Sequence, residues 1–336
     1  MKEITESINL CDENGNLNPL AIGWSRRPLH DCNLSGHFFR KKRWNYWAVY
    51  DRNLLFSATI SDVDYLKEMF CYYIDFETKD YYEKTFIMPP FSKGIRLGQS
   101  ISEEATFNSG DSIVRFSKTN EGMHIDVELP KTPKGRINAN IVVFDEGSES
   151  LNVVIPWSRR LFQYTSKQFC LRAEGEVSIG GNKHTFSRKE AFATLDFGRG
   201  AWKYSTFWNW GSFSAKLADG KIVGLNAGGG WTDGTGMNEN GLLIDGKLSK
   251  IFQDVIFDYD RADFMKPWHL YTKSSDMVDI VLKPFFERKA KTNMLIVSSQ
   301  FHQMFGAISG TLKDDSNHKY EINDAIGWVE EHNARW

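Results

Sequence analysis

The chain has 336 residues, a formal net charge of −2 and an aromatic content of 14% that includes 11 Trp. This length supplies core material for two domains, and the near-neutral charge excludes a global attraction to nucleic acid or to anionic lipid. The short basic cluster at 40–43 is therefore interpreted as a solvated turn end rather than a binding patch.

Residues 1–36 carry turn signals but no clear periodicity, which predicts a segment that lies across a domain surface or plugs a barrel end. The first residues lack the apolar core of a signal peptide, and no stretch approaches the roughly 18 apolar residues of a membrane span. We therefore expect a cytoplasmic protein that does not cross a membrane.

The cysteines Cys11, Cys32, Cys71 and Cys170 are far apart and form no CxxC pair. In a reducing compartment we expect them to be free thiols that pack as small apolar side chains. A zinc site needs His or Cys ligands at short spacing, which the sequence lacks, so no metal is expected.

Short β-branched or aromatic runs bounded by turn residues follow one another along the chain. Residues 44–65 predict a hairpin, and residues 65–91 predict further strands. Alternating segments at 113–116, 124–129 and 137–144 predict a meander of antiparallel strands. The segments after 156, including 293–312, continue this pattern without a sustained period of 3.6 residues. The predicted class is all-β with little helix.

The stretch 196–230 is the richest in large recognition side chains. Trp202, Tyr204, Trp208 and Trp210 share one parity, so a strand would place all four aromatic side chains on one face. The turn signal at 218–220 leads into the run 221–229, which predicts a long hairpin. We predict that this hairpin forms one wall of a pocket.

A weak internal repeat relates RWNYW at 43–47 to FWNWG at 207–211. The offset from Trp44 to Trp208 is 208 − 44 = 164 residues, close to half the chain, as two duplicated barrels would give. Barrels hide their sheet edges, and a barrel of about eight strands holds one small ligand. We expect an N-terminal barrel domain over 1–190 and a C-terminal barrel domain over 191–336.

The chain resembles the bacterial family known as domain of unknown function 2804 in four segments: WNYWAVYDRNLLFSATISDVDY, DFGRGAWKYSTFWNWGSFSA, GLNAGGGWTDGTGMNEN and IGWVEEHNARW. The likeness covers nearly the whole chain, and DFGRGxWxYxxxWxWG is its most specific part. The family is distantly similar to AttH and to carotenoid hydratase (hydroxyneurosporene synthase). These relatives imply two lipocalin-like antiparallel barrels related by duplication. They include hydratases and cyclases that use acid–base chemistry without a redox cofactor.

Asp196 and Arg199 lie at one end of the predicted hairpin, and Asn226 lies at the other. In the functional interpretation, Asp196 is an acid or base at a pocket mouth and Arg199 sets its pKa. In the alternative, the two residues form a structural ion pair that holds a Gly-flanked bend.

The aromatic face of the hairpin has two interpretations. It is a stacking wall for a sugar ring or a prenyl chain, or it fills a barrel interior or the contact between barrels. The glycine-rich loop that follows carries Asp233, Asn238 and Glu239. No GxxxxGK motif or EF-hand spacing is present, so the loop is a polar lid with a second carboxylate, or simply a solvated turn.

Strand alternation around residue 300 puts His302 on one face and Gln303 on the other. In the functional interpretation, His302 relays a proton near neutral pH. In the alternative interpretation, it is a hydrogen-bonded residue of the core. Glu330 on the last predicted strand is a further inward-facing carboxylate. The motif GxSxG is absent.

The leading hypothesis is a cofactor-independent enzyme with a pocket in or between the barrels, which performs hydration, dehydration, hydrolysis or cyclisation of a small hydroxylated, sugar-like or isoprenoid-like molecule. A non-catalytic lipocalin-type carrier and a purely structural module are the alternatives. A small-molecule ligand is the expected partner, and the oligomeric state stays open. The catalytic candidates are Asp196, Glu239 and His302. The substrate-binding candidates are Arg199, Trp202, Tyr204, Trp208, Asn209, Trp210, Asn226, Asp233, Asn238, Gln303 and Glu330.

Overall fold

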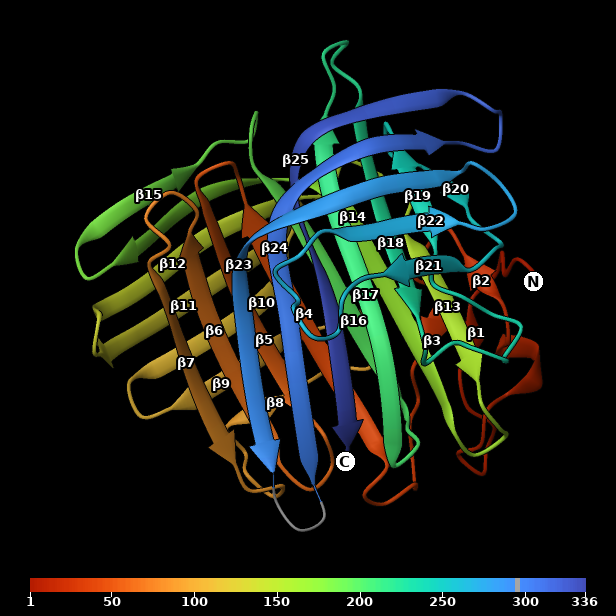
Figure 1. Cartoon of the computed structure of the whole chain (residues 1–336). Coiled ribbons are helices and arrows are strands. Elements are labelled where there is room, and N and C mark those ends of the chain that lie inside the picture. Colours follow the sequence, from red (N-terminus) through yellow and green to blue (C-terminus); the bar gives the residue numbers. More distant parts are fainter. Residues whose placement is uncertain (294–296) are drawn as a thin grey trace.

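The computed structural model describes residues 1–293 and 297–336, and strands dominate it (Figure 1). Within these residues the single helical element is a short 3-10 turn, η1 (Pro19–Ala21). The predicted all-β class with little helix is confirmed. The strand predicted at 293–312 is present as β24 (Ser298–Lys313), while residues 294–296 lie outside the described part of the chain.

The N-terminal half forms a large antiparallel sheet that curls into a barrel, in the strand order β7-β6-β5-β4-β16-β14-β12-β11-β10-β9-β8. The long strand β14 is irregular between Gln168 and Leu171, where Cys170 adopts a φ of 59°. This irregularity lets β14 pair with β13 and β16 first and with β12 and β15 further on. The bounds are β4 (Lys41–Tyr50), β5 (Leu54–Asp62), β6 (Lys67–Asp75), β7 (Tyr81–Met88), β8 (Ile95–Arg96), β9 (Ala105–Ser109), β10 (Ser112–Lys118), β11 (Gly122–Thr132), β12 (Gly135–Phe144), β13 (Leu151–Pro156), β14 (Phe162–Ile179), β15 (Asn182–Phe186) and β16 (Phe192–Ala201).

The C-terminal part forms a second antiparallel sheet, in the order β20-β19-β18-β17-β25-β24-β23-β22-β21. The predicted central hairpin is confirmed, because β17 pairs with β18 from Asn209 opposite Gly229 to Lys216 opposite Ile222. The bounds are β17 (Ser205–Lys216), β18 (Ile222–Gly229), β19 (Gly241–Ile244), β20 (Lys247–Lys250), β21 (Val255–Asp258), β22 (Trp268–Thr272), β23 (Val278–Asn293), β24 (Ser298–Lys313) and β25 (Lys319–Arg335). Together the two curled sheets confirm the expected pair of lipocalin-like barrels.

The change from one sheet to the other falls between Ala201 and Ser205. Strand β16 pairs with β4 on one side and with β14 on the other. It therefore belongs to the N-terminal sheet, although it lies beyond the boundary predicted at residue 190. Each sheet encloses its own apolar core.

A third core lies between the two barrels, and we call it the seam. Figure 1 shows the long strands β23, β24 and β25 crossing the face formed by β4, β5 and β6. The two members of the sequence repeat meet here, because the rings of Tyr46 and Trp210 contact edge to face with centroids 5.9 Å apart. The residues buried in the seam are mostly aromatic and include Tyr46, Tyr50, Tyr72, Trp210, Phe305 and Trp328.

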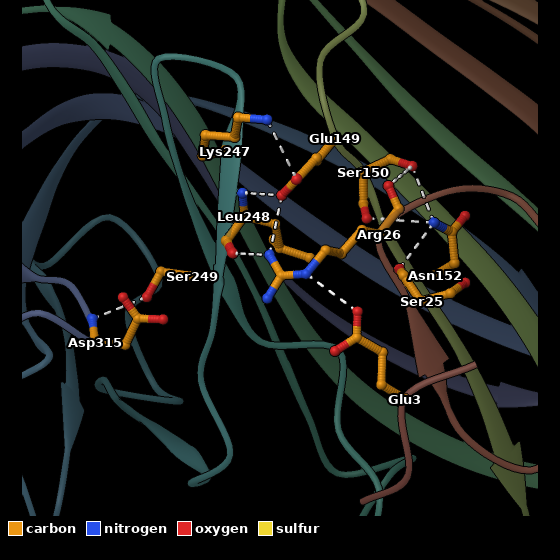
Figure 2. A network of polar contacts seen from close by, with 10 residues as sticks. All are labelled: Glu3, Ser25, Arg26, Glu149, Ser150, Asn152, Lys247, Leu248, Ser249 and Asp315. Atoms are coloured by element: carbon orange, nitrogen blue, oxygen red, sulfur yellow. Dashed lines mark hydrogen bonds and ion pairs between the residues drawn. The ribbon is translucent and has the colours of Figure 1, made fainter. Parts of the chain in front are cut away.

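The N-terminal segment, with β1 (Ile8–Asn9), β2 (Trp24–Ser25) and β3 (His30–Asp31), packs onto the first barrel and ties it to the second. Arg26 bonds Glu3 at 3.1 Å and Glu149 at 2.9 Å, and it also donates to the carbonyl of Leu248 on β20 (Figure 2). Lys247 lies 3.6 Å from Glu149 in the same network. This network of polar contacts joins three parts of the chain that are far apart in the sequence: the N-terminal segment, the loop before β13 and strand β20. Among the described residues, no helix has the length and apolar character of a membrane span.

Candidate functional site

Strand register brings four ionisable side chains to the seam. Lys167 on β14 lies opposite Asp196 on β16, and Glu330 on β25 lies opposite Trp210 on β17. Opposite residues of an antiparallel pair share one face. Glu239, from the loop before β19, completes the group. We call Lys167, Asp196, Glu239 and Glu330 the seam cluster.

Lys167 is the centre of the seam cluster. Its Nζ lies 2.9 Å from Oδ2 of Asp196 and 3.3 Å from Oε2 of Glu239. The same ammonium lies 4.5 Å from the ring centroid of Trp210, within the range of a cation–π contact. Burial disfavours the charge on Lys167, but the two neighbouring carboxylates outweigh burial and raise its pKa. Lys167 is therefore a cation at neutral pH.

Glu239 is held firmly by its surroundings. Its Oε1 accepts a hydrogen bond from the indole of Trp231 at 2.9 Å. Asn226 donates to the Glu239 backbone carbonyl at 2.7 Å and accepts from the indole of Trp210 at 2.9 Å. A Cβ at Gly228 would lie 2.0 Å from Oε1 of Glu239, so only glycine leaves room for this carboxylate. Burial raises the pKa of Glu239, against the opposing effect of Lys167.

Glu330 is buried, and its carboxylate forms no ion pair with any residue in the described part of the chain. Its Oε1 accepts a hydrogen bond from the indole of Trp208 at 2.8 Å. Burial raises the pKa of Glu330 to about 7; the Trp208 bond and the charge of Lys167 lower it, and the charge of Asp196 adds to the rise. A group with this pKa is partly protonated at neutral pH, so Glu330 can donate or accept a proton there.

Water reaches Asp196 more readily than its partners. The exposed fraction of its side chain is 15%, against 5% for Lys167 and 2% for Glu239. Its other oxygen, Oδ1, accepts a hydrogen bond from the hydroxyl of Thr165 at 3.3 Å. Several seam-facing side chains on this side of the molecule are only half-buried and include Trp44, Glu68, Phe70, Trp208, Phe301 and His332. The carboxylate of Asp196 is therefore the more exposed of the two carboxylates that are paired with Lys167.

A second polar network adjoins the seam cluster. Arg288 on β23 bonds Glu83 on β7 at 2.8 Å and lies 4.3 Å from the ring of Tyr72. The hydroxyl of Tyr72 lies 2.9 Å from that of Tyr46 and donates to Gln303 at 3.3 Å. The predicted residue Gln303 thus lies in the seam, where it bridges the two barrels.

His332 is a neutral imidazole beside the aromatic wall. Burial and the charge of Arg288 lower its pKa to about 3. Its ring lies 4.1 Å from that of Trp208, and its Nε2 lies 2.7 Å from the hydroxyl of Ser299. Trp208 and His332, whose rings are inclined by 49°, together form an uncharged aromatic surface next to Glu330.

The aromatic stripe predicted on one strand is divided in the structure. Trp208 and Trp210 share the seam face of β17, whereas Trp202 and Tyr204 precede that strand. Trp202 is buried, stacks on Trp231 with centroids 5.4 Å apart and donates to Gln163 at 2.6 Å. Tyr204 is 42% exposed. The prediction of four aromatic side chains on one strand face is wrong, because β17 begins only at Ser205.

The predicted pairing of Arg199 with Asp196 does not form. Three positions apart on β16, the two side chains point to opposite faces. Arg199 is fully buried and donates to the carbonyl of Trp44 at 2.8 Å, to the carbonyl of Gly98 at 3.0 and 3.1 Å, and to Asn45 at 2.8 Å. These neutral partners identify Arg199 as part of the wall of the first barrel.

His302 is also separated from the seam cluster. On β24 it shares a face with Met304, which lies in the interior core of the second barrel, whereas Gln303 faces the seam. Its Nδ1 lies 2.7 Å from Glu287, and its ring stacks on Phe264 with centroids 4.2 Å apart. The predicted partnership between His302 and Asp196 is therefore wrong, because a sheet lies between them.

The remaining predicted residues lie outside the cluster. Asn209 donates to the hydroxyl of Tyr259 at 3.0 Å and faces the second barrel. Asp233 is exposed and accepts from the backbone of Gly230 within a turn. Asn238 is buried and accepts from Lys250.

Sequence reasoning did not identify Lys167, Arg288 or His332. A lysine inside the otherwise apolar and weakly polar run FQYTSKQFCL was a signal for Lys167, since a strand with both faces buried rarely contains an unpaired lysine. Arg288 and His332 stand among other polar residues, and no comparable signal marks them.

Two curled antiparallel sheets, joined through an aromatic seam that holds buried carboxyl groups, define a double lipocalin-like β-barrel protein. The chain belongs to the family described as Domain of unknown function (DUF2804), whose model matches residues 1–336. The resemblance seen in the sequence is thereby confirmed. A search of curated proteins finds no match to this sequence.

Solved structures that align with this chain differ widely from it in sequence. The crystal structure of CghA with Sch210972 matches 90% of this chain and 92% of its own, with a TM-score of 0.56 and 10% identity. A protein assigned as an AttH from Nitrosomonas europaea matches 87% and 92%, with a TM-score of 0.48 and 14% identity. Kievitone hydratase from Nectria haematococca matches 87% and 88%, with a TM-score of 0.45 and 9% identity. At such identities, the likeness to CghA shows the fold alone.

Proposed function

We propose that the seam is the active site of an enzyme that transfers protons to and from a small hydroxylated, sugar-like or isoprenoid-like molecule. The proposed reaction is hydration or dehydration without a redox cofactor, with hydrolysis and cyclisation as related outcomes. One observation carries the proposal: two buried carboxyl groups, Glu239 and Glu330, and the half-buried carboxylate of Asp196 share the charge of one buried ammonium group. A single lysine cannot balance three carboxylate charges, so part of the cluster retains a proton near neutral pH.

The surroundings of the carboxyl groups assign their roles. Asp196 is ion-paired with Lys167 and is the most exposed of the ion-paired groups, which suits a general base. Glu330 has a pKa of about 7 because it is buried, which suits a general acid. Glu239 is enclosed and forms an ion pair with Lys167, so it acts as a positioning residue.

A dehydration step illustrates the proposed chemistry. Asp196 takes a proton from the carbon next to a carbonyl group, and the electrons of the broken C–H bond form a C=C bond. Glu330 protonates the departing hydroxyl group, which leaves as water. Asp196 ends protonated and Glu330 ionised, and hydration is the reverse sequence. Trp208 and the neutral imidazole of His332 offer an uncharged aromatic surface for the apolar part of the substrate.

The shared fold supports the proposal, because the crystal structure of CghA, a protein of this architecture, was determined with Sch210972. Removal of a positioned acid or base lowers a catalysed rate by roughly 10²–10⁴-fold. The variants Asp196→Asn and Glu330→Gln therefore separate catalysis from simple binding.

The test incubates the purified protein with a small-molecule extract and follows, by mass spectrometry, compound pairs that differ by one water. We expect wild-type protein to convert such a pair, and we expect Asp196→Asn and Glu330→Gln each to lose at least about a hundredfold in rate. The matched control is Asp111→Asn, which alters an exposed carboxylate far from the seam. A carrier would retain compounds without converting them, and equal rates in all variants would contradict the assigned roles.

The pH dependence provides a further check. Dehydration requires Glu330 to be protonated and Asp196 to be ionised. Because the pKa of Glu330 is about 7, the dehydration rate should decline as the pH rises through about 7. The residual activity of Glu330→Gln should lack this decline, as measured in a pH–rate profile.

A further inference from the structure

A cavity lies inside the N-terminal barrel, on the other side of its wall from the seam. Its volume is about 230 Å³. A cavity of roughly 150 Å³ accommodates benzene, so this one has room for a fused two-ring molecule. Apolar and aromatic side chains that belong to the barrel core or pack against it line one part of the cavity: Trp47, Met123, Val143, Tyr164, Leu171 and Phe197. Polar and charged side chains, among them Lys118, Asp145 and Gln168, line the rest.

One buried polar group in this lining is His30. Its side chain comes from β3 of the N-terminal segment, is only 4% exposed and lies 4.8 Å, centroid to centroid, from the ring of Tyr164. Its Nε2 lies 2.9 Å from the carbonyl oxygen of Ala21. A carbonyl oxygen only accepts hydrogen bonds, so Nε2 carries the hydrogen and Nδ1 is left with a bare lone pair.

No described residue donates a hydrogen bond to Nδ1 of His30. Protonation does not remove the problem, because burial lowers the pKa of this imidazole and keeps it neutral. Buried acceptors in folded proteins nearly always have a partner, and an unpaired one costs stability. His30 lines the cavity, so a molecule bound there can supply the missing donor.

We propose that the N-terminal barrel binds a small aromatic or polycyclic molecule with one hydroxyl or N–H group, which donates a hydrogen bond to Nδ1 of His30. The apolar part of the lining contacts the ring system, and the unpaired acceptor selects molecules that have a donor. This site is independent of the proposed chemistry in the seam. It would remain if the seam were not catalytic.

Two probes of nearly equal shape test the proposal on the full-length wild-type protein. 2-Naphthol carries a donor, whereas 2-methoxynaphthalene lacks one. Isothermal titration calorimetry should show that 2-naphthol binds at least about tenfold more tightly, since the ether leaves the buried acceptor unpaired. The ¹⁵N resonance of His30 Nδ1 should move when 2-naphthol binds and should stay in place with 2-methoxynaphthalene.

The variant His30→Phe preserves a ring and removes the acceptor, so it should reduce the ratio of the two affinities to about one. The seam variant Asp196→Asn should leave both affinities unchanged. Equal affinities in the wild-type protein would overturn the proposal, and so would no binding of either probe, which would mean that only water occupies the cavity. Loss of 2-naphthol binding in Asp196→Asn would place the site in the seam and would also overturn it. The wild-type comparison stands even if His30→Phe fails to fold.

Discussion

Charged side chains on the two faces of strand β16 have opposite kinds of neighbour. Arg199 points into the first barrel, where every hydrogen-bond acceptor that it meets is a neutral oxygen. Asp196 points into the seam, where it meets one cation and two further carboxyl groups. The guanidinium of Arg199 thus has hydrogen-bond partners but no opposite charge beside it. In the seam, by contrast, ionisable groups that compete for protons lie side by side. Burial alone therefore does not mark a chemical site; competition among neighbouring ionisable groups does.

The contrast extends to proton binding. Burial lowers the pKa of Arg199 to about 9, so its guanidinium remains charged throughout the neutral range. In the seam, burial raises the pKa of Glu330 to about 7, so its charge changes within that range. We expect variants on the seam face to change stability in a pH-dependent way and variants on the barrel face to change it equally at every pH between 5 and 8.

The largest effect is expected for Lys167→Met, which removes the only cation within 4.0 Å of Asp196 and Glu239 among the described residues. The free energy of unfolding should fall by about 3–5 kcal/mol at pH 8, because uncompensated buried carboxylates remain. The loss should be smaller at pH 5, where a carboxyl group can bind a proton instead. Urea denaturation at both pH values measures this, with the exposed Lys203→Met as control. An equal loss at both pH values would argue against a coupled cluster.

Glu330→Gln should stabilise the protein. A carboxyl group with a pKa of about 7 in the fold and near 4.5 in the unfolded chain binds protons more tightly when folded. The loss of folding stability that Glu330 causes is absent below about pH 4. It grows as the pH rises to about 7 and reaches about 3 kcal/mol above that pH. The variant should thus gain about 3 kcal/mol at pH 8 and nothing at pH 4, as followed by thermal unfolding. The exposed Glu321→Gln on the same strand is the control, and a loss of stability at pH 8 would refute the assignment.

Arg199→Met examines the other face of β16. It removes hydrogen bonds to the carbonyls of Trp44 and Gly98 and to Asn45, but it also relieves the burial of a charge. We expect a net loss of about 2 kcal/mol in the free energy of unfolding, the same at pH 5 and pH 8. Chemical denaturation at the two pH values checks this. A marked pH dependence would mean that the two faces are not as different as the structure indicates.

The smallest effect is expected for Gly228→Ala. The new Cβ would lie 2.0 Å from Oε1 of Glu239, so this carboxylate must shift away from Trp231 and Lys167. We expect a loss of about 1 kcal/mol in the free energy of unfolding. Gly229→Ala is the matched control, because its nearest neighbours lie 3.8 Å away. Equal stabilities of the two variants would show that the close fit around Glu239 is unimportant.

Much of the fold was open to prediction, because strand signals are local. Alternation and turn residues predicted the hairpin of β17 and β18, and the echo of Trp44 in Trp208 indicated a duplicated architecture. The start of β17 was misjudged. The parity rule was extended backwards through Tyr204, although the chain leaves one sheet after Ala201 and enters the other at Ser205.

The candidate site was predictable only in part. Asp196, Glu239 and Glu330 were identified as carboxylates near aromatic residues, and the structure places them together. Lys167, which organises them, was missed because strand register decides that it lies opposite Asp196. Register depends on how distant strands align, and short-range pattern does not contain that information.

The sequence by itself determined that this chain folds as all-β barrels rich in aromatic side chains, because period-two alternation and turn chemistry act over a few residues. The tertiary structure decided which face of each strand meets the other barrel. That choice placed Asp196 beside Lys167, turned Arg199 and His302 away from them, and left Nδ1 of His30 unpaired inside the first barrel. Such pairings join residues from distant parts of the chain, so they arise only when the two sheets pack.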